Sequence, residues 1–293
     1  MRFRLDPHDP LARGIRRVAR KEADVALAVI AHAHPLSEPN VHALRKSLKR
    51  LRALMKLVED PRRKRLRRSS LALAPLRDVD VVRSTLKSLV SEEPRLMPAD
   101  MLAEVRQQLR RLHRERLEAC IVDRTIKKVG KAVRDAASRL AGWRPAVREF
   151  ASCRPGLIRA HQRCRRALIR AASSGLDVDF HEWRKRLSVV RDHLVLIAPR
   201  GSEVHAEALA LDRAVTSLGD DHNLVVLREI LEHLSTEQRP VIDFGRLHRS
   251  LAKRQRQLHQ DALTGASEIC LRDSDDYARR IEAAWRQARS GRR

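Results

Sequence analysis

Three sequence blocks occur twice in this chain, in the same order. The stretch 41–52, VHALRKSLKRLR, is echoed by 180–191, FHEWRKRLSVVR. Further along, the block that begins at Arg77 matches the one that begins at His222, and a block containing Arg110 matches one containing Arg256. Ordered self-similarity of this kind is the signature of a duplicated structural unit. We therefore expect two copies of one architecture, residues 1–143 and residues 144–293.

Apolar residues recur every three or four positions within each copy, which indicates amphipathic helices separated by proline and glycine. The expected helices span 11–34, 38–58, 62–92 and 99–140 in the first copy, and 156–174, 179–198, 202–236 and 241–288 in the second. The last helix could be interrupted near 273–276. Four amphipathic helices with short connections pack as a bundle. The predicted fold is therefore all-α, with two tandem pseudo-symmetric four-helix bundles.

Composition agrees with this class and excludes others. Hydrophobic residues make up 43% of the 293 residues, which is enough to form a core. The 10 glycines and 8 aromatic residues (4 Phe, 3 Trp and 1 Tyr) are few for a β-rich fold. The longest apolar run, 25–31, is too short to span a bilayer, and residues 1–10 lack the apolar core of a signal peptide. We therefore expect a cytoplasmic protein. The four cysteines contain no Cys-x-x-Cys pair, so neither a disulfide framework nor a zinc site is indicated, and no metal or cofactor is predicted.

The chain carries 62 Lys and Arg against 37 Asp and Glu, which gives a net charge of +25. Such an excess repels itself and is usually retained because a polyanion neutralises it. Most of the basic residues are arginine, whose planar guanidinium donates two parallel hydrogen bonds to phosphate oxygens. A GC-rich genome would also raise the arginine content, and that interpretation stays open. The charge by itself favours a phosphate-rich partner.

One helix of each copy places basic residues directly beside its apolar seam. In 38–58 and in 179–198 the basic residues follow the apolar residues by one position, so they form a stripe rotated by about 100° from the seam. Neither stripe contains an acid, whereas an ordinary solvated face mixes both signs of charge. A solvated face whose long side chains cover apolar neighbours is the alternative, and two aligned copies count against it. The first basic stripe is His42, Arg45, Lys49 and Arg52, and the second basic stripe is His181, Arg184 and Arg191.

Neighbouring helices carry further candidate cations. These are Arg17, Arg20 and Lys21 in 11–34, Arg159, Arg163 and Arg166 in 156–174, Arg110 in 99–140, and Lys253 and Arg256 in 241–288. For this group an ordinary solvated face is an equally good interpretation. Asp78 and Asp80 could suggest metal ligands, but no histidine or further acid stands at ligand spacing. We expect these two carboxylates to pair with nearby arginines.

Four motifs in this chain resemble the CHAD family, the conserved histidine α-helical domain. They are His42-x-x-Arg45-Lys46-x-x-Lys49-x-x-Arg52, RDVDV at 77–81, HEWRKR at 181–186 and LGDDHNL at 218–224. The resemblance extends from about residue 10 to residue 288. It implies two four-helix bundles around a basic central cavity that binds inorganic polyphosphate without catalysis. The cavity residues that it implies are His42, Arg45, Lys46, Lys49, Arg52, His181, Arg184, Lys185 and Arg191. Ser188 departs from the pattern, because it stands where Lys49 stands in the first copy.

Two other classes of function compete with polyphosphate binding. An architectural nucleic-acid-binding protein would suit the charge and is the alternative, although no helix-turn-helix, zinc finger or set of stacking aromatics is apparent. An enzyme acting on phosphoanhydrides would need a G-x-x-x-x-G-K-[ST] loop or a Glu-x-Glu-x-Lys strand, and the sequence has neither. We therefore predict no catalytic residue. The resemblance also makes association with cytoplasmic polyphosphate granules an expectation.

Overall fold

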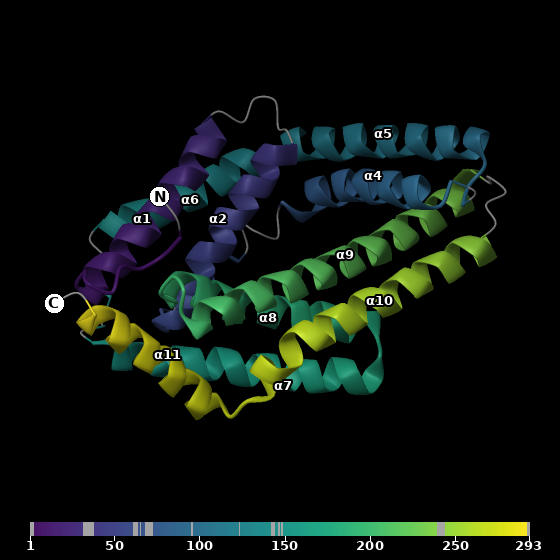
Figure 1. Ribbon diagram of the computed structural model, residues 1–293. Helices are drawn as coiled ribbons and strands as arrows, with labels where there is room; N and C mark the ends of the chain where they lie inside the picture. The colour runs from purple at the N-terminus through teal and green to yellow at the C-terminus, as the bar shows by residue number, and fades with distance from the viewer. Residues whose placement is uncertain are drawn as a thin grey trace.

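The computed structural model describes residues 3–31, 38–60, 64, 66–67, 73–94, 96–122, 124–141, 144–145, 147, 149–238 and 244–291. Within these ranges the regular structure is helical throughout, so the predicted all-α class is confirmed (Figure 1). The α-helices of the first half are α1 (Leu11–Ala31), α2 (Glu38–Leu57), α4 (Ala74–Glu92), α5 (Ala99–Val122) and α6 (Thr125–Ala141). A short 3-10 helix (Phe150–Cys153) precedes α7 (Arg154–Ser174), α8 (Asp177–Ile197), α9 (Glu203–Gln238), α10 (Phe244–Leu271) and α11 (Ser274–Ser290).

Local sequence signals account for several helix ends. At α7 the ring of Pro155 occupies the first turn, where no backbone donor is lost, and Gly175 ends the helix with a φ of 67°. At α11 the side chain of Asp273 accepts hydrogen bonds from the backbone of Asp275 and Asp276, at 2.9 and 3.1 Å. The interruption expected near 273–276 is therefore confirmed, with a helix cap as its cause.

The fourth helix of the first half differs from the expectation. The continuous helix expected over 99–140 is divided into α5 and α6, with Arg124 in the left-handed region at a φ of 51°. Arginine rarely adopts this conformation. The sequence has no glycine or proline at this point that would have indicated the break. In the helix expected over 62–92, α4 begins at Ala74, and residues 64, 66 and 67 are also helical. The positions 62, 63, 65 and 68–72 lie outside the described residues.

The helices of the two halves correspond in order and in packing. In the first half α1 packs against α2 and α6, and α4 packs against α5; in the second half α7 packs against α8 and α11, and α9 packs against α10. The long hairpins α4–α5 and α9–α10 lie side by side in Figure 1, in contact through α4 and α9. Across the halves, α2 packs against both α7 and α8. The duplicated basic helices, α2 and α8, therefore meet each other.

Two large apolar cores hold the described helices together, and each combines residues from both halves. The larger core contains Leu48 and Leu54 of α2 together with Trp183 and Leu187 of α8. The second core joins α4 and α5 to α9 and α10, for example through Leu227 of α9. No helix in the described part of the chain is both long and apolar enough to cross a membrane. The two copies thus share their buried interior, and the boundary at residue 143 stays a prediction.

Candidate functional site

The second basic stripe lies where α8 faces α9. Trp183, Leu187 and Val190 form the fully buried seam of α8, and His181, Arg184 and Arg191 are half-buried beside it. The ring of His181 lies 4.1 Å from the ring of His222 on α9, measured between centroids. Arg184 lies close to Gly219 of α9, because a Cβ at that glycine would be 4.0 Å from its Nη1. The helix packing therefore brings the histidine motif of α8 onto the downstream motif of α9.

Acids from neighbouring positions partly neutralise this stripe. Arg191 forms an ion pair with Asp192, 2.9 Å from its Nε, and donates a hydrogen bond from Nη1 to Asp212 of α9. Lys185, on the same helix, pairs with Glu182 at 2.7 Å. The hydroxyl of Ser188 donates to the backbone carbonyl of Arg184, at 2.8 Å. The stripe contains no acid of its own, as the sequence indicates, yet its charge is reduced by carboxylates beside it.

The first basic stripe lies on α2 in the equivalent position beside its seam. Leu44, Leu48 and Leu51 are buried, Arg45 and Arg52 are half-buried, and His42 and Lys49 are exposed, as is the nearby Lys46. Burial lowers the pKa of Arg52, and the nearby positive charge of Arg67 lowers it further. A guanidinium that is both desolvated and close to another cation gains from a bound anion. This end of the stripe therefore favours a negatively charged ligand.

The two stripes converge on one buried carboxylate. Asp192 lies on α8 at the contact with α2, and burial raises its pKa, while the positive charges of Arg191, Arg50 and Lys49 lower it. Arg50 also pairs with Glu22 of α1, at 3.2 Å. Cations of α2 and of α8 thus meet around Asp192, and Glu22 and Asp212 each offset one of them. The arrangement is a charged centre built from both copies of the repeat.

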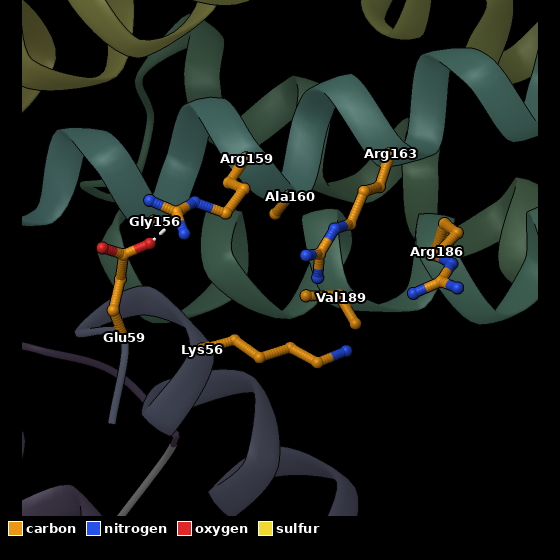
Figure 2. Close-up of a pocket in the computed structure, with 8 residues that line it drawn as sticks. All are labelled: Lys56, Glu59, Gly156, Arg159, Ala160, Arg163, Arg186 and Val189. Atoms are coloured by element: carbon orange, nitrogen blue, oxygen red, sulfur yellow. Dashed lines mark ion pairs between the residues drawn. The ribbon is translucent and has the colours of Figure 1, made fainter. Parts of the chain in front are cut away.

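A second group of cations lines two adjoining pockets beside α7 and α8, which we call the α7–α8 groove. The smaller pocket, of about 190 Å³, is shown in Figure 2, where the side chains of Lys56, Arg159 and Arg163 lie along the space between α2, α7 and α8. The larger pocket, of about 620 Å³, shares Arg163 and Arg186 with the smaller one. Its other charged lining residues are Arg166, Arg170, Asp179 and Glu182. The groove is therefore rich in arginine but contains acids.

The structure gathers three of the outlying candidates into this groove, namely Arg159, Arg163 and Arg166. The others lie elsewhere or are already paired. On α1, Arg17 pairs with Asp9 at 3.0 Å, Arg20 is exposed and Lys21 is half-buried. On the long hairpins, Arg110 of α5 and Lys253 and Arg256 of α10 are exposed. Their assignment as binding residues stays a prediction.

Three basic residues that line the groove were not identified as candidates from the sequence. Lys56 stands four positions after Arg52 and Arg170 four positions after Arg166, so both continue a helical row that was already recognised. Helical spacing would have found these two. Arg186 lies on α8, and only the packing of α8 beside α7 brings it to the groove.

Equivalent histidines of the two halves each pair with an aspartate. His113 of α5 lies 3.2 Å from Asp80 of α4, and His259 of α10 lies 3.0 Å from Asp221 of α9. Asp80 therefore meets a histidine where we expected an arginine; its pKa is raised by burial, although the charges of His113 and Arg83 lower it. The side chain of Asp78 lies outside the described residues. These pairs tie each long hairpin together, and the ring of His259 also stacks on Phe180 of α8, with the ring centroids 3.5 Å apart.

The comparisons with known proteins agree with the fold. The family model of the CHAD domain matches residues 40–232. Among solved structures, the chain is similar to the crystal structure of the CHAD domain from the plant Ricinus communis, with 18% sequence identity and a TM-score of 0.56, over 97% of this chain and 94% of that chain. Similarity to a solved structure at 18% sequence identity supports the fold alone. Comparison with curated proteins finds no match.

Proposed function

The chain belongs to the CHAD domain family, and on that premise we propose that it binds inorganic polyphosphate along its two basic stripes without catalysing a reaction. The observation that carries the proposal is the convergence of Lys49 and Arg50 of α2 with Arg191 of α8 around Asp192. A linear polyanion would compete with Glu22 and Asp212 for the cations of this centre. Arginine suits this task because its fork of donors matches phosphate oxygens.

The proposal makes polyphosphate the partner and gives the protein a binding role. Each phosphate contact releases counterions, so the affinity should fall steeply as the salt concentration rises. A protein that holds polyphosphate in this way would associate with polyphosphate granules in the cytoplasm. Nucleic acid is the competing polyanion. We expect polyphosphate to displace DNA at a far lower phosphate concentration than DNA needs to displace polyphosphate.

The decisive experiment combines charge reversal with a charge-matched control. Arg45→Glu with Arg184→Glu reverses one half-buried cation in each stripe. Arg134→Glu with Arg289→Glu makes the same change in charge on exposed positions of α6 and α11. We expect the first pair to abolish binding in titrations with long-chain polyphosphate, and the second pair to retain it. Far-UV circular dichroism should show the same helical content for both variants.

Two results would contradict the proposal. Equal losses in the two double variants would mean that only the overall charge matters and that no defined site exists. No binding by the wild-type chain at low salt would remove polyphosphate as the ligand. A separate assay of phosphate release, with and without Mg²⁺, addresses the absence of catalysis, and we expect no release above the background.

A further inference from the structure

The α7–α8 groove and the second basic stripe lie on opposite sides of α8. Each stripe residue follows a seam residue by one position, as Arg184 follows Trp183. The groove residues Glu182 and Arg186 instead precede Trp183 and Leu187 by one position. One position rotates the side chain by about 100° around the helix, in opposite senses for the two sets. The groove is therefore a separate surface from the second stripe.

Carboxylates line the groove, but each already has a partner. Glu59 pairs with Arg159, at 2.9 Å. Glu182 pairs with Lys185 at 2.7 Å and with Arg186 at 2.5 Å. Asp179 accepts a hydrogen bond from the hydroxyl of Ser174, at 2.7 Å. Because this hydroxyl is neutral, Asp179 keeps its negative charge, and one carboxylate charge remains against the other arginines of the groove.

Three of those arginines form a row of uncompensated positive charge. Arg163, Arg166 and Arg170 are exposed, line the larger pocket, and make no ion pair with an acid in the described part of the chain. They stand three and four positions apart on α7, so they lie on one helix face with axial steps of about 4.5 and 6 Å. Like charges at this spacing repel one another. A bound polyanion would relieve that repulsion along the whole row.

Lys56 connects this row to the first basic stripe. It follows Arg52 by four positions on α2, so it continues the line of His42, Arg45, Lys49 and Arg52. It also lines the smaller pocket, which shares Arg163 and Arg186 with the larger one. A continuous succession of cations therefore leads from α2 into the groove (Figure 2).

We propose that the α7–α8 groove is an extension of the polyphosphate site that only long chains reach. This inference rests on the proposed function, since it assumes that the stripes hold polyphosphate. A short oligophosphate would occupy the stripes alone. A long chain would continue past Lys56 onto Arg163, Arg166 and Arg170, and the joined segments would raise its affinity by an effective-concentration effect. The groove thereby selects for chain length.

The test uses tripolyphosphate and long-chain polyphosphate as probes, titrated into the full chain. The groove variant is Arg163→Gln, Arg166→Gln and Arg170→Gln, three exposed positions whose replacement leaves the core intact. The charge-matched control is Arg165→Gln, Arg134→Gln and Arg289→Gln, and its three arginines are exposed and do not line the groove. Relative to the control, we expect the groove variant to bind long chains about tenfold more weakly. The slope of log affinity against log salt should be smaller by about 2. Tripolyphosphate should bind both variants equally.

The possible failures can be told apart. A wild-type chain that binds neither probe refutes the proposed function, and the groove inference with it. If the wild-type chain binds but the groove variant matches the control in affinity and salt slope, only the groove inference is overturned. If the groove variant loses tripolyphosphate as strongly as the long chain, the groove is a primary site and the extension is likewise overturned.

Discussion

Single residues make the two basic stripes unequal in the positive charge that they offer to a ligand. In the second stripe, Arg191 is held by two carboxylates, Asp192 and Asp212, and the hydroxyl of Ser188 is taken by a backbone carbonyl. The first stripe has Lys49 at the position of Ser188. The second copy therefore offers less positive charge to a ligand, both because it has one cation fewer and because acids already occupy part of the rest.

Asp212 pairs with Arg191, so under the proposed function Asp212→Asn should remove a competitor and tighten the binding of polyphosphate. Exposed ion pairs contribute about 0.2–1 kcal/mol, which corresponds to an affinity gain of up to about fivefold. The matched control is Asp276→Asn, which makes the same charge change at the exposed pair with Arg279 on α11. Titration with long-chain polyphosphate measures both. Equal gains in the two variants would show a general electrostatic effect and no competition at Arg191.

His193 makes the contact between α2 and α8 sensitive to acid. Its Nε2 lies 2.9 Å from the backbone carbonyl of Ala53. Burial lowers the pKa of His193 to about 4; the hydrogen bond with Ala53 opposes this and the charge of Lys56 adds to it. The unfolded chain has the ordinary pKa of 6.5 and binds more protons between these two values. The contribution of neutral His193 to the free energy of unfolding is therefore fully present above pH 6.5. It decreases by about 3 kcal/mol as the pH falls toward 4.

The test compares wild type with His193→Gln, whose side-chain amide can donate to the same carbonyl but does not titrate. We expect the free energy of unfolding, measured with denaturant between pH 7 and pH 4, to fall more steeply in wild type. Other titrating groups contribute to both proteins, including His161, whose pKa is lowered by burial. The difference between the two curves therefore isolates His193. Parallel curves would contradict the prediction.

At the level of elements, a close approach of two helices fixes the α7–α8 groove relative to α2. A Cβ at Gly156, in the first turn of α7, would lie 2.0 Å from the carbonyl oxygen of Leu57 at the end of α2. The backbone cannot yield as a flexible side chain would. The absence of a side chain at residue 156 therefore sets how closely α2 and α7 pack.

Gly156→Ala should consequently destabilise the fold, by roughly 1–3 kcal/mol, because it overpacks a backbone contact. Gly265→Ala serves as the control within a helix, since its added Cβ would find Ala210 and Ala214 no closer than 3.8 Å. Replacing a helical glycine where space is available stabilises by about 0.5–1 kcal/mol. Equilibrium unfolding in denaturant should therefore shift in opposite directions for the two variants. A shift in the same direction would refute the explanation by close approach.

At the level of the whole molecule, the shared cores predict that the two halves unfold together. The larger core alone includes residues of α1 and α2 as well as α7 and α8. Tryptophan fluorescence reports the second half, through buried Trp183 and Trp285, in a Trp143→Phe background. Far-UV circular dichroism reports the helices of both halves. We expect the two signals to give one coincident transition in denaturant. Separate midpoints would mean that the halves fold independently.

The sequence by itself determined the features that depend on neighbours along the chain. Helical class, the repeat and the basic stripes beside the seams of α2 and α8 follow from a spacing of three and four residues, which is a property of one helix. The cap at Asp273 is equally local. The break at Arg124 was not predictable in this way, because an arginine at positive φ leaves no compositional signal.

Only the tertiary structure decided which helices face each other, and with that how the charges are distributed. The pairing of Arg159 with Glu59 joins residues of different halves, as does the approach of Lys49 and Arg50 to Asp192. No periodicity within a helix records such contacts, because the packing of separate helices creates them. The same packing separated the α7–α8 groove from the second stripe and merged the cores of the two copies. The basic central cavity that the family resemblance implies stays a prediction, whereas the structure shows a charged centre around Asp192 and a groove that Lys56 lines.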